Sequence, residues 1–171
     1  MTQAAMNNGI VLYELKLERE MVEASLGVLT QMPKLISVLS SPIISEQEKE
    51  QLLNRIGSEM QMPEKLIIFL KVMCRHNMAE ELPDIYTYYK QYWDEQHKVK
   101  RVCCIFASEP SEKQMQEIKN FLDARYEGYT LVYQTQIKPE LLGGVILRVE
   151  HEEYDWSYEG RLAQMEQAIR A

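Results

Sequence analysis

The hydrophobic periodicity of this chain changes near Lys98, and that change restricts the possible folds more than any other feature. Before Lys98, apolar residues recur every three or four positions, which is typical of amphipathic helices. The segment from Val99 to Ala107 lacks this spacing and is rich in residues that favour strands. The sequence therefore predicts an α+β protein with two domains, a helical bundle over residues 1–97 and a small α/β module over residues 98–171.

Prolines, a glycine and capping residues divide the first domain into about six helices. Pro33 suits the first turn of a helix, and Ser45 with Glu48 has the spacing of a capping box. We expect Gly57 to end the helix that this box opens, and Pro63 to open the next one. The first domain is therefore predicted to be a six-helix bundle.

The second domain is predicted to contain about three strands and two helices. A second strand is expected over residues 129–137, where apolar and polar side chains alternate, and a third over residues 145–149. Ser111 is placed to cap the helix that precedes the second strand. A closing helix is expected from about Ser157 onward.

Composition favours a protein as the main partner. The chain has 171 residues, of which 46% are hydrophobic, so it is long enough to bury a core. Its 26 acidic and 19 basic residues give a net charge of -7, which argues against binding to nucleic acid or to an anionic lipid surface. No apolar run approaches the roughly 20 residues that span a bilayer. We therefore expect no direct membrane insertion, and any association with a membrane must be indirect.

The residues that usually carry chemistry form no motif. His76, His97 and His151 share no metal-ligand spacing with one another or with cysteine. Cys103 and Cys104 could supply a reactive thiol, but their apolar strand favours the interpretation of buried small hydrophobes. Three cysteines give no disulfide framework, which fits a reducing cytosol. We expect no catalytic residues, no metal and no cofactor.

A glycine pair, Gly143–Gly144, directly precedes the third predicted strand. A phosphate-binding loop would precede a helix instead, so the pair gives no support for nucleotide binding. Two glycines in succession allow a tight turn or a close approach of another backbone. After the strand, Asp155 and Ser157 stand where the closing helix needs its cap.

In order and spacing, this C-terminal segment closely resembles the signature of the delta subunit of bacterial F-type ATP synthases, which in mitochondria is called the oligomycin-sensitivity-conferring protein. The residues that carry the resemblance are Gly143, Gly144, Arg148, Asp155, Ser157, Arg161 and Leu162. Weaker similarities extend upstream over nearly the whole chain. One departure stands out, because Trp156 occupies a position where the family usually has glycine.

The resemblance implies a subunit of the peripheral stalk that has no active site of its own. In that family the N-terminal six-helix domain holds the N-terminal helices of the alpha subunits, and the C-terminal domain joins the membrane-anchored b subunits. It also implies one copy per complex, a monomer when isolated, and a location on the cytoplasmic face of the bacterial cell membrane. A stalk subunit must withstand the torque of rotational catalysis. A chain with two rigid modules is suited to this task, because each module can offer an apolar groove to a partner helix.

The resemblance also places the partner-binding residues. The alpha-subunit groove on the first and fifth helices is expected to involve Ile10, Tyr13, Glu14, Leu17, Phe69, Val72 and Met73. The contact with the b subunits is expected to involve Leu162, Met165 and Ile169. Two alternatives remain open at this point. An enzyme would need titratable groups that converge in a pocket, and a helical protein–protein adaptor of another cytoplasmic assembly would need only the grooves.

Overall fold

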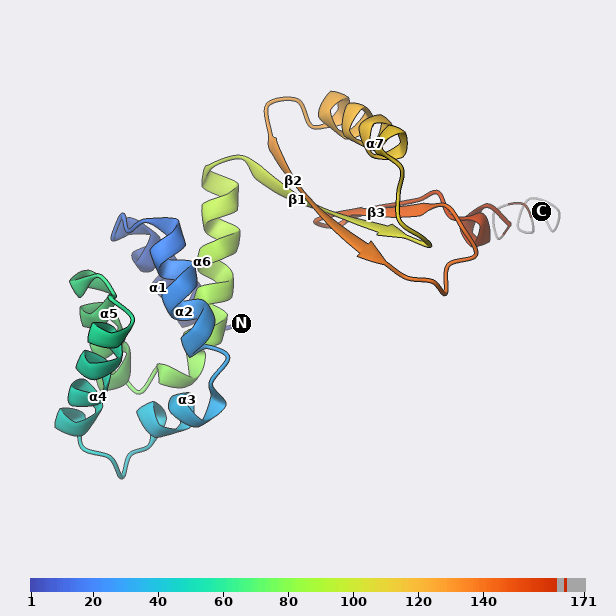
Figure 1. Ribbon diagram of the computed structural model, residues 1–171. Helices are drawn as coiled ribbons and strands as arrows, with labels where there is room; N and C mark the ends of the chain where they lie inside the picture. Colours follow the sequence, from blue (N-terminus) through green and yellow to red (C-terminus); the bar gives the residue numbers. More distant parts are fainter. Residues whose placement is uncertain (163–164, 166–171) are drawn as a thin grey trace. The chain divides into compact units, whose positions relative to one another are not determined.

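The computed structural model describes residues 1–162 and residue 165. Contacts between α-carbons divide the chain into two compact units, Met1–Trp93 and Asp94–Ala171. The described residues of the first unit form helices, and those of the second form a mixed sheet with helices. The α+β class that the periodicity predicts is therefore confirmed (Figure 1).

The first unit consists of helices joined by short turns. The bounds are α1 (Gln3–Glu14), α2 (Arg19–Leu29), α3 (Pro33–Ser40), α4 (Glu46–Glu59), α5 (Glu64–Arg75), the 3-10 turn η1 (Ala79–Glu81) and α6 (Leu82–Gln96). The predicted capping box is present, because the Ser45 hydroxyl accepts from the Glu48 backbone N–H at 3.3 Å and the Glu48 carboxylate accepts from the Ser45 backbone N–H at 3.0 Å. Pro33 stands in the first turn of α3, as expected.

The prediction that Gly57 ends its helix is wrong. Helix α4 continues to Glu59, and Gly57 is buried where a β-carbon would collide with the side chain of Ile67 on α5. The chain turns later, at Gln61, whose φ of 51° is left-handed. The Met62 backbone N–H then donates to the carbonyl oxygen of Gly57 at 2.8 Å, which satisfies the end of the helix. Gly57 is thus a site of close helix packing and not a stop.

Leucine side chains from every part of the helical unit form its core. The largest fully buried side chains include Leu12, Leu26, Leu53, Leu66 and Leu70, together with Ile85. Helix α1 approaches α6 closely at Gly9, where a β-carbon would lie 3.2 Å from the carbonyl oxygen of Ile85. A side chain at this position would push the two helices apart.

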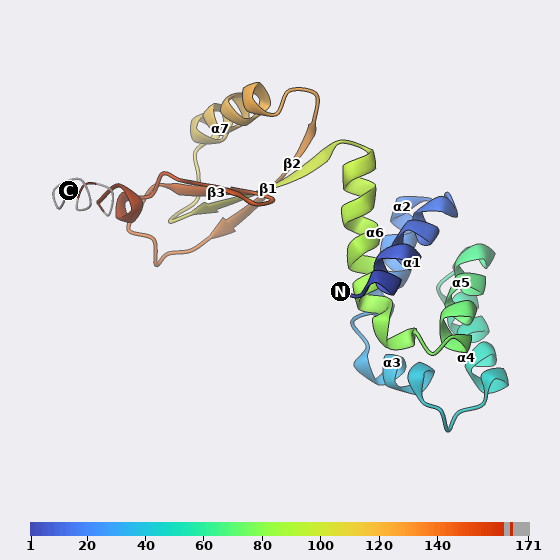
Figure 2. The same ribbon diagram turned by 180° about the vertical axis from the view of Figure 1, so that it is seen from behind.

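The second unit is a four-stranded sheet with one helix packed on it. Its elements are β1 (Val99–Phe106), α7 (Glu112–Arg125), β2 (Thr130–Ile137), β3 (Val145–Val149) and β4 (Glu152–Asp155). The strand order is β2-β1-β3-β4, with β1 and β2 parallel and the other pairs antiparallel. Figure 2 shows α7 on one side of the sheet. There Ile118 and Leu122 pack against Val102, Cys104 and Leu147 in a second core.

The sheet has one strand more than the predicted three. Strand β4 was not expected because its sequence, Glu-Glu-Tyr-Asp, has no apolar alternation. It forms because the chain reverses at Glu150, whose φ is 52°, and returns alongside β3. Across this hairpin the Arg148 guanidinium pairs with the Glu153 carboxylate at 2.5 Å. An edge strand of this kind needs only backbone pairing and polar cross-strand contacts.

The closing helix begins where it was expected. Residues 158–162 are helical, and so is Met165. The Ser157 hydroxyl accepts from the Gly160 backbone N–H at 3.1 Å, which is the bond of a helix N-cap. Ile169, which was predicted to lie on this helix, falls outside the described residues.

Candidate partner-binding surfaces

Helix α5 presents apolar side chains both to the core and to the surface. Phe69 and Met73 were predicted to bind a partner, but they are only 5% and 4% exposed and belong to the core. The outward face instead carries Ile68, which is 52% exposed, and the predicted Val72, which is 37% exposed. They are four positions apart, so they are neighbours on adjacent turns of the helix. The sequence pattern missed Ile68 because eight of the twelve residues of α5 are apolar, so its apolar stripe is wider than the side that the core covers.

The predicted residues on and after α1 also differ in how far they are exposed to solvent. Ile10 and Tyr13 are half-buried on α1, and Glu14, its last residue, is exposed. Leu17 is half-buried too, but it lies in the turn between α1 and α2 and not on the first helix, because the chain turns at Lys16, whose φ is 51°. The Tyr13 ring makes an edge-to-face contact with Tyr92 of α6, with 5.1 Å between the ring centroids, so it packs within the unit. The exposed apolar residue of this helix is Val11.

The glycine pair of the second unit packs against the start of the closing helix. Gly143 and Gly144 have φ values of 150° and 86°, which side chains disfavour. The Tyr158 backbone N–H donates to the carbonyl oxygen of Gly143 at 3.0 Å, and the Trp156 backbone N–H donates to that of Val145 at 2.9 Å. A β-carbon on Gly144 would collide with the backbone of Trp156 and Ser157. The predicted close backbone approach is therefore confirmed.

Asp155 and Ser157 lie on the other side of the contact that the glycine pair makes. The Asp155 carboxylate accepts from the Ser157 backbone N–H at 2.8 Å. A β-carbon on Gly160 would lie 2.6 Å from the Asp155 carboxyl carbon, so this third glycine gives the carboxylate its space. Gly160 was not predicted, although its position three residues after the cap Ser157 is the sign that could have identified it. We call Gly143, Gly144, Asp155, Ser157 and Gly160 the glycine junction.

The remaining signature residues have different roles. Arg148 fastens the β3–β4 hairpin through Glu153. Arg161 is exposed, and its backbone N–H donates to the carbonyl oxygen of Ser157 at 3.1 Å. Leu162 and Met165, which were predicted to contact the b subunits, are 61% and 64% exposed. The closing helix, which starts at the glycine junction, thus carries two apolar side chains that face solvent.

A cleft of about 350 Å³ opens beside the glycine junction, between α7 and the ends of β1 and β3. Its lining residues are Phe106, Gln114, Glu117, Ile118, Phe121, Gly144, Val145 and Trp156. The rings of Phe121 and Trp156 meet edge to face, with 4.9 Å between their centroids. No sequence pattern indicates this cleft, because its walls come from segments that are distant along the chain.

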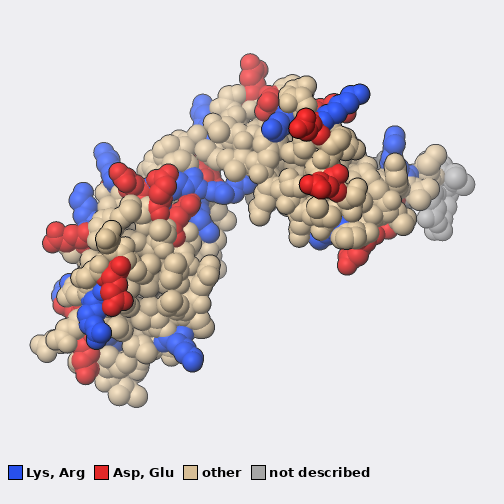
Figure 3. Space-filling view, viewed as in Figure 1, with Lys and Arg blue, Asp and Glu red and all other residues tan. Residues whose placement is uncertain are grey.

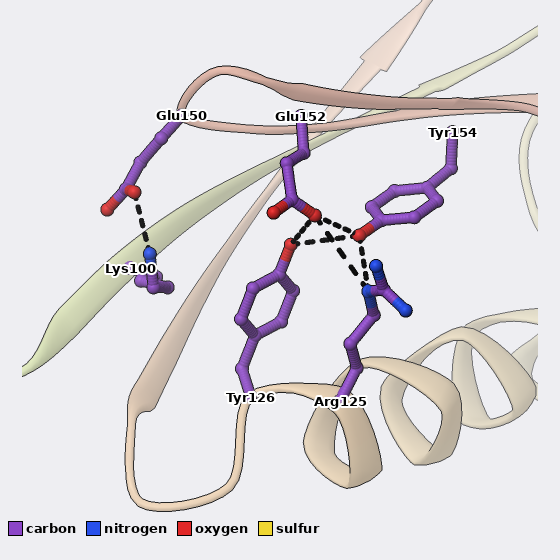
Figure 4. Close-up of polar contacts among 6 residues, drawn as sticks. All are labelled: Lys100, Arg125, Tyr126, Glu150, Glu152 and Tyr154. Carbon is purple, nitrogen blue, oxygen red and sulfur yellow. Dashed lines mark hydrogen bonds and ion pairs between the residues drawn. The ribbon is translucent and has the colours of Figure 1, made fainter.

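Next to the Phe121 and Trp156 rings, which form the aromatic wall of the cleft, the Tyr154 ring belongs to a polar cluster. This cluster lies at the C-terminal end of α7 (Figure 4). The Tyr154 hydroxyl accepts from the Arg125 Nε at 2.6 Å and donates to the Glu152 carboxylate. The Tyr126 hydroxyl donates to the same carboxylate at 2.8 Å. We call Arg125, Tyr126, Glu152 and Tyr154 the tyrosine cluster. Its polar groups bond to one another, so the cluster ties β4 to the end of α7.

The tyrosine cluster shifts the acidities of its members. Hydrogen bonds from Tyr154 and Tyr126 lower the pKa of the Glu152 carboxyl. Burial, together with the bonds to Tyr154 and Glu152, raises the pKa of Tyr126. Both shifts strengthen the arrangement of a phenol that donates to a carboxylate at neutral pH. The hydrogen bonds that cause these shifts stabilise the contact between β4 and the end of α7.

Burial makes two of the three cysteine thiols poorly reactive. Burial raises the pKa of Cys104 to about 11 and raises that of Cys74 as well. Among the described residues, no group of three or more His, Cys, Asp or Glu is arranged to hold a metal ion. In the same part of the chain, no helix is both long enough and apolar enough to cross a membrane.

Figure 3 shows charged residues of both signs interspersed on one face of the molecule. On the face shown, Lys and Arg lie next to Asp and Glu over both units. A nucleic-acid-binding face would instead gather basic residues into a patch. Exposed apolar side chains such as Ile68, Leu162 and Trp156 are therefore the better candidates for contact with a partner.

Comparison with known proteins extends over both units. The family model described as ATP synthase delta (OSCP) subunit matches residues 11–169. ATP synthase subunit delta of Chlorobium limicola is 31% identical over 137 residues, which are 80% of this chain and 75% of that protein. ATP synthase subunit delta of Lactobacillus acidophilus is 26% identical over 137 residues, 80% of this chain and 74% of that protein.

A solved structure has the same fold. A chain in the cryo-EM structure of the Toxoplasma gondii mitochondrial ATP synthase hexamer aligns with a TM-score of 0.67 and 16% identity, and the alignment covers 100% of this chain and 99% of that one. The identity is low, so this likeness concerns the fold alone. The family match over residues 11–169 decides the assignment, and the chain belongs to the family of ATP synthase delta (OSCP) subunits.

Proposed function

We propose that this peripheral-stalk subunit joins the catalytic head of an F-type ATP synthase to its membrane-anchored b subunits. The helical unit would hold the N-terminal helices of the alpha subunits, and the α/β unit would hold the b subunits at the cytoplasmic face of the membrane. The observation that carries the proposal is the family match, which spans both compact units. The subunit then acts as a connector and performs no chemistry itself.

The alpha-subunit contact is proposed for the outward faces of α1 and α5. Val11, Ile68 and Val72 are exposed there on a unit whose core is otherwise closed. An amphipathic helix could lay its apolar side on these residues, which is the usual mode of helix recognition. Phe69 and Met73 would support this face from within the core and would not contact the partner.

The b-subunit contact is proposed for the closing segment of the α/β unit. Leu162 and Met165 are exposed apolar residues that follow the glycine junction directly. The junction fixes the start of their helix by backbone hydrogen bonds, so their side chains are carried by a defined support. Ile169 remains a predicted member of this contact.

Reconstitution tests the proposal. Membranes stripped of this subunit should lose proton-driven ATP synthesis, and adding the chain back should restore it. The isolated chain should hydrolyse no ATP. Unchanged ATP synthesis after the addition would contradict the proposed role.

Paired surface variants test which unit binds which partner. Ile68→Lys with Val72→Lys should weaken binding of an alpha N-terminal peptide and leave b binding intact. Leu162→Lys with Met165→Lys should do the reverse. Val28→Lys serves as a matched control, because Val28 is 43% exposed on another helix of the first unit. Equal loss of both partners in either variant would contradict the assignment, and capture of neither partner by the unaltered chain would favour an adaptor of another assembly.

A further inference from the structure

The cleft between α7 and Trp156 combines aromatic walls with a single carboxylate. Phe121 and Trp156 are 37% and 40% exposed, although both are large apolar rings. Glu117 is the one charged residue in the cleft lining, and no hydrogen bond or ion pair to it is found within residues 1–162 and 165. The amide oxygen of Gln114 already accepts from the Ser111 backbone N–H at 3.0 Å as part of a helix cap. Glu117 is therefore the side-chain acceptor of the lining that remains available to a cationic ligand.

The aromatic wall is held in place from behind. The Tyr154 ring meets Phe121 edge to face, with 5.7 Å between the centroids, and lies 6.4 Å from the Trp156 ring. Its hydroxyl is fixed by Arg125 and Glu152 in the tyrosine cluster. A ring system fastened in this way loses little conformational freedom when a ligand binds, which favours recognition.

An aromatic face next to an unpaired carboxylate is complementary to a cation on an apolar stem. Arginine and lysine side chains have this chemistry, because their methylene groups pack on rings while the charged group pairs with a carboxylate. The net charge of -7 also favours a basic partner. A volume of about 350 Å³ accommodates such a side chain together with part of its neighbour.

We propose that the cleft formed by Glu117, Phe121 and Trp156 receives an arginine or lysine side chain from a helix of the b subunit. This inference rests on the proposed function, since it assumes that the α/β unit binds b. It adds an anchor that the exposed residues Leu162 and Met165 do not provide, because their contact is apolar and carries no charge. The cleft would thereby select partner helices that place a cation next to an apolar residue.

Binding of the cytoplasmic segment of the b subunit from the same organism, measured by calorimetry, tests the inference. Glu117→Gln keeps the shape and removes the charge, and should weaken binding about threefold to tenfold, with a weaker dependence on salt. Trp156→Leu keeps an apolar side chain and removes the aromatic face, and should weaken binding about tenfold. Glu109→Gln is the control, because it makes the same charge change in a loop that does not line the cleft.

The partner side chain is identified by replacing each arginine and lysine of the b segment with methionine. One such variant should bind the unaltered chain weakly and should lose nothing further when Glu117→Gln is combined with it. Unaltered affinity for both Glu117→Gln and Trp156→Leu would overturn the inference while leaving the b contact standing. If Glu109→Gln weakened b binding as much as Glu117→Gln does, the effect would come from the net charge of the chain and not from the cleft. That result would also overturn the inference. A complete lack of b binding by the unaltered chain would instead overturn the proposed function, and this inference with it.

Discussion

Gly144 and Ser157 are in such close contact that a β-carbon on Gly144 would lie 2.7 Å from the α-carbon of Ser157. Gly144 also has a φ of 86°, so a side chain there would meet both backbone strain and a steric collision. The contact joins the entrance of β3 to the first residues of the closing helix. The stability of the α/β unit should therefore be sensitive to this single position.

We expect Gly144→Ala to destabilise the α/β unit by on the order of 1–3 kcal/mol and to weaken b binding. Gly128→Ala is a matched control, since Gly128 has a similar φ of 84° but nothing within 4 Å of the β-carbon position. It should cost only the backbone strain, about 1 kcal/mol. Chemical unfolding of both variants measures the difference. Equal losses would show that the collision with Ser157 has no energetic effect.

The tyrosine cluster should make stability depend on pH in the acidic range. Hydrogen bonds lower the pKa of Glu152 below its ordinary value of 4.5 in the folded chain, so the folded state favours the ionised form. This contribution is present above the ordinary pKa and is lost as the pH falls through the lowered one. The stability difference between the unaltered chain and Glu152→Gln should therefore shrink between about pH 7 and about pH 3. Glu127→Gln, which removes an exposed carboxylate outside the tyrosine cluster, is the control for the loss of one negative charge. A constant difference for Glu152→Gln would contradict the prediction.

Residues 1–97 should fold without the rest of the chain. They contain the whole core of the helical unit, including Ile85 and Tyr89 of α6, which are 0% and 2% exposed. Circular dichroism and urea unfolding of this fragment should show a helical protein with a cooperative transition. A fragment that ends at Glu81 lacks α6 and should not fold. If residues 1–97 show no cooperative transition, the domain boundary near Lys98 is wrong.

Thiol reagents should distinguish Cys103 from the other two cysteines. Cys74 and Cys104 are buried and have raised pKa values, whereas Cys103 is partly exposed. In the folded chain at about pH 8, Cys103 should react first, and the other two should react only in denaturant. Mass spectrometry after timed labelling measures the order. Fast labelling of folded Cys103→Ser would contradict the burial of the remaining thiols.

The sequence was most informative where local chemistry decides the structure. The capping box at Ser45 and the helix cap at Ser111 form as expected, because a hydroxyl that bonds a backbone N–H three residues later needs no distant contact. Gln114 completes a capping box at Ser111 that was not predicted. Asn77 adopts the left-handed conformation that ends α5, and it is a residue type that tolerates this conformation. Strand β3 has the predicted bounds, Val145–Val149, because its apolar run starts after the glycine pair and ends before the polar residues Glu150 and His151.

Prediction failed where the whole fold imposes a local conformation. Lys16, Gln61 and Glu150 are left-handed although their residue types give no sign of it, and these positions set the breaks after α1, after α4 and before β4. Packing in the rest of the molecule stabilises these turns, and a local pattern does not contain that information. The partner surfaces were harder still, because a helix whose apolar stripe is wider than the core needs, such as α5, does not indicate which apolar residues remain exposed.

The glycine junction has a genetic consequence. At Gly160 the obstacle to a β-carbon is the side chain of Asp155, so a second mutation that shortens residue 155 can make room and act as a suppressor. At Gly144 the obstacles are the carbonyl oxygen of Trp156 and the α-carbon of Ser157, which every amino acid supplies. No replacement at 156 or 157 removes those atoms. Selection for restored growth should therefore yield second-site suppressors of Gly160 variants, but only reversion to glycine for Gly144 variants.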